Sequence, residues 1–158
     1  MMAKTKAELM LELIEATRAN QVATEKMDEA ASRAMGVNRT DARCIHVIDR
    51  GGRLSAGRLA EEASLTTGAV TAVIDRLESK GYARRLPDPD DRRRVLVELT
   101  DLARERAWGL YGPLGERGRP HLERCSASEL ELLIDFMRLG TELNEERSAE
   151  VRADLGDR

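Results

Sequence analysis

The sequence predicts a mainly α-helical fold with one small β-hairpin. Three observations lead to this fold class. Apolar residues recur at helical spacing over long stretches, aromatic residues make up only 3 % of the chain, and a two-residue alternation occurs in a single region, between residues 82 and 99. A core built from Leu, Ala, Val and Ile, in a chain of which 35 % is charged, is typical of extended helices with solvent-exposed faces.

The first predicted helix covers residues 5–34, without an internal proline or glycine. Gly36 follows it at the position of a C-terminal cap, where glycine adopts a left-handed conformation without strain. A second helix runs to about Arg50, and either Asn38 or Thr40 can cap its first turn. The Gly-Gly pair after Arg50 is expected to end it.

Two short helices follow at the spacing of a helix-turn-helix unit. Ser55 can cap the first, which runs to about Ala63, and Thr66 or Thr67 can cap the second, which runs to about Lys80. Two short helices that cross closely need a compact apolar lattice between them. The residues predicted to form it are Leu59, Ala60, Ala63, Leu65, Val70, Val73, Ile74 and Leu77.

Residues 82–86 and 94–99 predict two strands of a hairpin, joined by a loop rich in Pro and Asp. Three consecutive arginines, Arg92, Arg93 and Arg94, lie at or just past the tip of this loop. Seven basic and four acidic side chains fall between residues 76 and 94, so this segment carries a net charge of +3, against −3 for the whole chain. A local basic patch of this kind is what binding to a polyanion requires, whatever the net charge of the protein.

The rest of the chain is again helical. Thr100 can cap a helix that runs to about Leu110, and the glycines and prolines between residues 109 and 120 predict a kink or an interruption after it. Ser126 and Glu129 have the spacing of a capping box, which opens a last helix. Residues 148–158 are polar, and we expect them to be frayed.

The second short helix and the hairpin together point to binding of duplex DNA. Small residues and hydroxyls near the helix N-terminus allow a close approach to the major groove, and arginines on a projecting loop suit the negative potential of a narrow minor groove. Taken separately, each feature also fits an ordinary solvated surface; joined through Gly81, they indicate a winged helix-turn-helix between residues 53 and 100. The candidate DNA contacts are Ser55, Thr66, Thr67, Gly68, Ala69, Thr71, Ala72, Arg76, Arg84, Asp91, Arg92, Arg93 and Arg94.

These residues resemble the MarR family of bacterial transcription regulators. The similarity lies in Leu-Thr-Thr-Gly-Ala-Val-Thr from Leu65, in Asp-Arg-Leu-Glu-Ser-Lys-Gly-Tyr from Asp75, and in Asp-Pro-Asp-Asp-Arg-Arg from Asp88. The resemblance implies that residues 66–76 form a recognition helix. It also implies that Arg93 enters the minor groove and is held by Asp91.

The resemblance further implies an organisation and an effector. Residues 1–37 and 101–158 would form dimerisation helices around a DNA-binding lobe at 38–100, and the homodimer would act as a repressor on a pseudo-palindromic operator. A small aromatic or phenolic effector is a family trait, with no other cofactor expected. The candidate ligand residues are His46, Trp108 and Tyr111, each of which has an alternative: His46 as a boundary histidine, and the two aromatic residues as interface packing.

Other functional classes receive little support. The two histidines lie far apart in sequence, and no Ser/His/Asp, Cys/His or metal-ligand spacing is present, so an enzyme is not expected. Cys44 and Cys125 fit no disulfide framework, and no apolar run is long enough for a membrane span, so we expect a cytoplasmic protein with no membrane partner. That the protein is bacterial is what the family resemblance implies. A winged helix that contacts another protein without reading DNA remains the alternative function.

Overall fold

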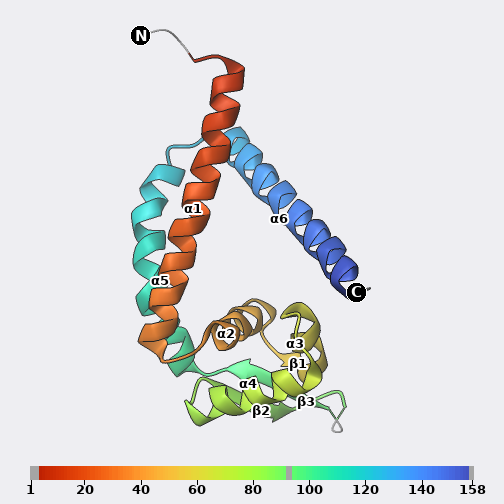
Figure 1. The fold of residues 1–158 in the computed structure, drawn as a ribbon. Coiled ribbons are helices and arrows are strands. Elements are labelled where there is room, and N and C mark those ends of the chain that lie inside the picture. The colour runs from red at the N-terminus through yellow and green to blue at the C-terminus, as the bar shows by residue number, and fades with distance from the viewer. Residues whose placement is uncertain (1–3, 92–93, 157–158) are drawn as a thin grey trace. The chain divides into compact units, whose positions relative to one another are not determined.

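The computed structural model describes residues 4–91 and 94–156 (Figure 1). The chain forms two compact units, one ending at Tyr111 and the other beginning at Gly112. In the described residues, the first unit holds four complete helices, the beginning of a fifth and a small sheet. The second unit holds the rest of the fifth helix and one further helix.

Helix α1 (Lys6–Met35) is a single uninterrupted helix, which confirms the long first helix. It begins with a capping box that the sequence analysis did not anticipate. The Thr5 hydroxyl accepts from the backbone N–H of Glu8, and the Glu8 carboxylate accepts from the backbone N–H of Thr5 at 2.7 Å. The helix ends at Gly36, whose φ of +66° confirms the predicted left-handed cap.

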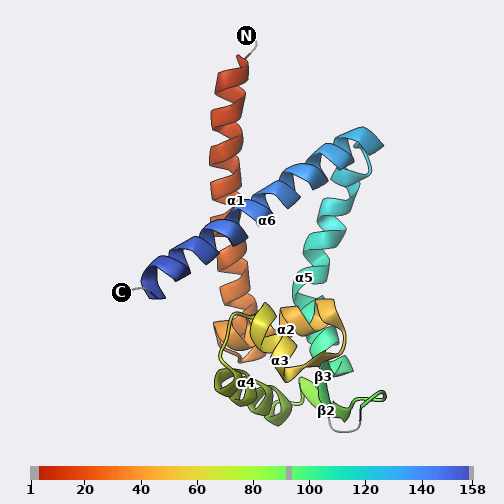
Figure 2. The same cartoon turned by 90° about the vertical axis from the view of Figure 1, so that its right-hand side faces the viewer.

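The next three helices and the strands gather at the C-terminal end of α1 (Figures 1 and 2). The helices are α2 (Arg39–Gly51), α3 (Ala56–Glu62) and α4 (Thr67–Ser79), and their N-caps are Asn38, Ser55 and Thr66. The strands are β1 (Leu54–Ser55), β2 (Ala83–Pro87) and β3 (Val95–Leu99), in the antiparallel order β1-β3-β2. Strand β1 was not predicted, because two residues are too few to produce a recognisable alternation.

The core lies between α2, α3, α4 and the inner face of the sheet. The predicted lattice of the two short helices is confirmed: Leu59, Val70 and Leu77 are fully buried, and Leu65 packs against the core from a partly buried position. Tyr82 joins the start of β2 to the end of α1, because its buried hydroxyl donates to the carbonyl oxygen of Met35 at 3.0 Å. Cys44 is fully buried in α2, and this burial raises the pKa of its thiol.

The last two helices are longer than predicted. Helix α5 (Asp101–Leu122) continues past Leu110 and contains Pro113 and Pro120. Of the two predicted alternatives, a kink or an interruption, the interruption was wrong. A proline removes one helical hydrogen bond, and the bonds of the turns on either side are enough to continue the helix here. The boundary between the two units falls inside α5.

Helix α6 (Ala127–Gly156) begins at the predicted capping box, in which the Glu129 carboxylate accepts from the backbone N–H of Ser126 at 2.7 Å. The helix reaches Gly156, so the expected fraying from residue 148 was also wrong. Polar contacts along the helix surface support its last turns. Arg147 pairs with Glu150 at 2.8 Å, and Arg152 Nε donates to the carbonyl oxygen of Ser148 at 3.2 Å.

Candidate nucleic-acid interface

Helix α4 presents one apolar face to the core and one open face to solvent. Val70, Val73, Ile74 and Leu77 are buried, whereas Gly68, Thr71, Ala72 and Asp75 are exposed at the three- and four-residue spacing of a single stripe. A Cβ added at Gly68 would meet nothing within 4 Å, so the space above this turn is open. Small side chains on an open stripe allow another molecule to approach the helix backbone closely.

The threonines at the start of α4 have different local roles. Thr66 caps the helix, because its hydroxyl oxygen accepts from the backbone N–H of Ala69 at 3.3 Å. The Thr71 hydroxyl donates to the carbonyl oxygen of Thr67 at 3.1 Å, and the Thr71 side chain is exposed. An exposed methyl group and a hydroxyl oxygen suit contact with base edges, where thymine offers a methyl group and adenine and cytosine offer amino groups. Ser55, another candidate contact, caps α3 by accepting from the backbone N–H of Arg58.

Arg76 was predicted to contact DNA, and its guanidinium is engaged elsewhere in the fold. Its Nη2 lies 2.5 Å from Asp41 Oδ1, and its Nε lies 3.2 Å from both carboxylate oxygens. Asp41 belongs to α2 and its side chain is only 3 % exposed, so the pair ties α4 to α2. The hydrogen bond to Asp41 raises the pKa of Arg76.

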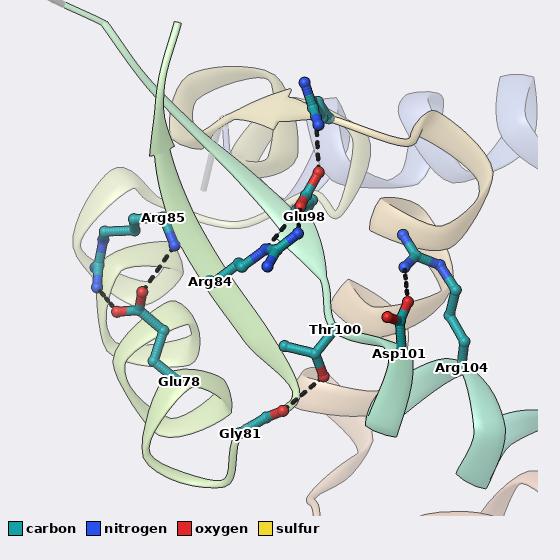
Figure 3. Close-up of polar contacts among 9 residues, drawn as sticks. Glu78, Gly81, Arg84, Arg85, Glu98, Thr100, Asp101 and Arg104 are labelled. Atoms are coloured by element: carbon teal, nitrogen blue, oxygen red, sulfur yellow. Dashed lines mark hydrogen bonds and ion pairs between the residues drawn. The ribbon is translucent and has the colours of Figure 1, made fainter.

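Arg84 belongs to a row of three charged side chains that crosses the sheet (Figure 3). Its Nη2 lies 2.5 Å from Glu98 Oε1, and Arg53 Nε lies 2.6 Å from Glu98 Oε2. The strand register explains the row, because Arg84 is the cross-strand partner of Glu98 and Arg53 directly precedes β1 on the other side of β3. The two guanidiniums, Arg53 foremost, hold the pKa of the buried Glu98 below its ordinary value.

Arg85, the next residue on β2, contacts α4 (Figure 3). Its Nη2 lies 2.7 Å from Asp75 Oδ1, its Nη1 pairs with Glu78 Oε2, and its backbone N–H donates to Glu78 Oε1 at 2.9 Å. These contacts, with that to Asp75 foremost, raise the pKa of Arg85. Arg84 and Arg85 therefore secure the same strand by contacts with different parts of the lobe.

The hairpin loop is organised by aspartates. The Asp88 carboxylate is buried and accepts from the backbone N–H of Asp90 at 2.9 Å, and its second oxygen lies 3.8 Å from Arg94 Nε. The backbone of Arg94 closes the loop, because its N–H donates to the carbonyl oxygen of Asp91 at 2.8 Å. Arg92 and Arg93, the two central arginines of the prediction, lie outside the described residues.

A second site lies beside the lobe, within the first unit. A pocket of about 1190 Å³ opens between α1, α2 and α5, and all three candidate ligand residues line it: His46, Trp108 and Tyr111. The Tyr111 hydroxyl donates to Asp28 Oδ1 at 2.8 Å, and burial together with this bond raises the pKa of Tyr111 to about 12. The charged residues of the pocket wall are three arginines, Arg39, Arg43 and Arg104, and three acids, Asp28, Glu29 and Asp49.

Among residues 4–91 and 94–156, no three His, Cys, Asp or Glu side chains are grouped so that they could hold a metal ion. No helix among them has a stretch that is both long and apolar enough to cross a membrane.

The lobe thus combines an open stripe on α4 with a charged hairpin, and its helix α2 also lines the neighbouring pocket.

Residues 35–94 match the sequence profile of the MarR family. The chain is 35 % identical to the HTH-type transcriptional regulator YcgE of Bacillus subtilis over 118 residues, which cover 75 % of this chain and 77 % of YcgE. It is 31 % identical to the multiple antibiotic resistance protein MarR of Salmonella typhimurium over 100 residues, or 61 % of this chain and 69 % of that protein.

The chain belongs to the MarR family of transcription regulators. It is a DNA-binding regulator, and its relatives are regulators and not enzymes. A solved structure of a mutant MarR from Escherichia coli in complex with operator DNA has a similar fold, with a TM-score of 0.50 and 25 % identity over 80 % of this chain and 94 % of that one. The winged helix-turn-helix architecture is confirmed.

Three side chains in this MarR-family lobe were not singled out by the sequence: Asp41, Arg53 and Glu98. Asp41 lies 35 positions from Arg76, and no local pattern connects them. For Glu98 a signal was present. A charged residue between the buried Val97 and Leu99 had to face away from the core, and Arg84 is its cross-strand neighbour once the hairpin register is fixed.

Proposed function

We propose that this MarR-family protein is a homodimeric, ligand-responsive repressor that binds a pseudo-palindromic operator. The observation that carries the dimer is the apolar surface that α6 leaves uncovered. Large apolar side chains are exposed along it: Leu132, Leu133, Ile134, Phe136, Met137, Leu139 and Leu143. The N-terminal part of α1 has a similar surface, at Leu9, Met10, Leu13 and Ile14. Apolar patches of this extent mark association surfaces, and a second copy of these two helices is the partner we propose.

Helix α4 is the proposed recognition helix, and the hairpin is the proposed wing. Residues 66–72 would enter the major groove, and the wing would reach the minor groove. A two-fold dimer would place two such helices in successive major grooves, with half-sites about one helical turn, or ~10 bp, apart. The working location is the cytoplasm, because that is where a bacterial regulator meets DNA.

The pocket is the proposed effector site. Trp108 and Tyr111 offer aromatic surface, and the three arginines offer partners for an anionic group, so a small aromatic acid or phenol is the ligand class that we infer. One face of α2 lines this pocket, while Cys44, Val47 and Ile48 of the same helix are buried in the core. A ligand that shifts α2 would therefore act on α4 through the core and through the Asp41–Arg76 pair, and would weaken DNA binding.

The dimer and the operator are tested together. The protein selects duplexes from a randomised pool, and sedimentation of the purified complex then gives its stoichiometry. We expect two chains for each duplex and a recovered consensus with two-fold symmetry. Leu133→Glu should sediment as a monomer and lose operator affinity, whereas Glu142→Gln, at an exposed polar position on the same helix, should behave as the wild type. A monomer that binds one half-site at full affinity would refute the proposal.

The effector is tested with the fluorescence of Trp108, the single tryptophan of the chain. Titration with benzoate and with 4-hydroxybenzoate should quench this fluorescence and release operator DNA over the same concentration range. His46→Ala and Tyr111→Phe should shift both curves together. Operator binding that does not respond to saturating concentrations of either compound would refute the inferred ligand class.

A further inference from the structure

Two carboxylates lie on α4 where a DNA-binding helix would be expected to avoid them. Asp75 continues the exposed stripe that begins at Gly68 and Thr71, and its side chain is 60 % exposed. Glu78 follows one turn later and is 30 % exposed. If α4 occupies the major groove, as proposed above, both negative charges come near DNA phosphates. Repulsion between like charges then opposes binding, most strongly at low salt.

Arg85 of β2 forms ion pairs with both carboxylates. One of its amino groups lies 2.7 Å from Asp75 Oδ1. The other amino group faces Glu78, and the backbone N–H of Arg85 also donates to Glu78 at 2.9 Å (Figure 3). Both amino groups of the guanidinium are thereby oriented toward protein carboxylates. The side chain is 35 % exposed, less than the neighbouring Arg84 at 61 %. Arg85 thus faces the recognition helix, and its geometry is that of an internal ion pair.

We propose that Arg85 is a positioning residue that makes the second half of α4 compatible with DNA, by neutralising Asp75 and Glu78 and drawing both carboxylates toward the wing. It acts on DNA through these two acids and not as a phosphate contact. The same contacts fix β2 against α4, so the spacing between recognition helix and wing depends on the same three side chains. The inference rests on the proposed placement of α4 in the major groove.

The proposal predicts strong coupling in a double-mutant cycle. Arg85→Gln removes the charge and leaves Asp75 and Glu78 unneutralised, so we expect operator binding at low salt to weaken about tenfold, equivalent to about 1.4 kcal/mol. In a background that carries Asp75→Asn and Glu78→Gln, no negative charge remains to be neutralised. Arg85→Gln should then change affinity less than twofold. Arg85→Lys, which keeps the charge and loses the planar fork, should restore part of the loss.

The assay is fluorescence anisotropy on a duplex that the wild-type protein has selected, over a series of salt concentrations. Arg84→Gln is the matched control, because it removes the same group from the adjacent residue while its partner, Glu98, lies on β3. Whatever affinity Arg84→Gln loses should be lost equally in both backgrounds. Melting temperatures of all variants separate changes in folding from changes in binding.

Two results would overturn the proposal. If Arg85→Gln lowers the DNA affinity equally in both backgrounds, Arg85 contacts DNA directly. The salt dependence of binding would then fall by about the amount expected for one lost phosphate contact. If Arg85→Gln leaves the wild-type affinity unchanged, the acids need no counter-ion. If Arg85→Gln fails to fold, Arg85→Lys is compared in the two backgrounds instead. It should weaken binding where Asp75 and Glu78 are present and change the affinity less than twofold where both acids are replaced, and equal losses in the two backgrounds contradict the proposal.

Failure of the underlying function gives a different pattern. If α4 is not the recognition helix, changes on its exposed stripe, such as Thr71→Ala, leave the selected duplex bound as before. A protein that is sensitive at Thr71 and shows no coupling at Arg85 refutes this inference alone.

Discussion

Removal of the Tyr82 hydroxyl is the smallest change that tests how the DNA-binding lobe is attached to α1. The hydroxyl donates to the carbonyl oxygen of Met35 at 3.0 Å, and the residue is only 5 % exposed. Met35 is the last residue of α1, so its carbonyl has no partner within the helix. Tyr82→Phe keeps the ring and leaves this buried acceptor without its donor.

The expected cost follows from that orphaned carbonyl. A buried hydrogen-bonding group that loses its partner destabilises a protein by about 1–3 kcal/mol. We take about 1.5 kcal/mol, since one neutral bond is lost and no cavity is made. For a chain of this size, that loss lowers the melting temperature by about 3–6 °C.

Tyr111→Phe is the matched control. Its hydroxyl also donates a hydrogen bond, to Asp28 at 2.8 Å, but Tyr111 is 40 % exposed, so water can replace the lost donor. We expect its stability to stay within about 0.5 kcal/mol of the wild type. Both variants are compared by urea and thermal unfolding at one fixed protein concentration, because association would make the melting temperature depend on concentration. Equal losses in the two variants, or none in Tyr82→Phe, would refute the reasoning.

Three further predictions concern charged and thiol groups. The pKa of Glu98 is depressed, so its ion pairs add stability at pH values above the ordinary glutamate pKa of 4.5, and this stability is lost as the pH falls through the lower folded value. Unfolding measurements should therefore show that Glu98→Gln loses less stability than the wild type between pH 6 and pH 3. Cys44 is fully buried with a raised pKa, whereas Cys125 is partly exposed, so a thiol reagent at pH 8 should label Cys125 first and Cys44 only on unfolding; equal rates would contradict the burial. Arg76→Met leaves the buried Asp41 carboxylate without its cation and should lower the melting temperature more than Asp41→Asn does. It should leave the salt dependence of DNA binding unchanged, and a reduced salt dependence would show that Arg76 contacts phosphate.

The course of the chain was largely predictable from local signals. The caps at Asn38, Ser55 and Thr66 act within three residues of themselves, and the left-handed glycines Gly36 and Gly81 act at single positions. Such signals do not depend on the rest of the fold, which is why the sequence alone reveals them. One error occurred where local signals compete, since the prolines of α5 suggested a kink or a break and the surrounding helix continued through them.

The candidate site divides in the same way. The open stripe of α4 was predictable, because helical spacing separates Gly68 and Thr71 from the buried Val70 and Leu77. The roles of the arginines were not, because Arg76, Arg84 and Arg85 look alike in a basic segment. Their partners come from other elements: α2 for Arg76, β3 for Arg84, and α4 for Arg85.

By itself, then, the sequence determined a basic hairpin joined to a helix with an open, small-residue stripe, and this was sufficient to predict binding to DNA. Only the tertiary structure decided which arginines of that hairpin are already neutralised. Helix and strand periodicity fix the direction of a side chain relative to its own element, whereas an ion pair depends on which elements the fold brings together. The buried Asp41 and Glu98 pair with arginines from other elements, which the packing of the lobe brings next to them. The charge that remains available to DNA is therefore a property of the fold.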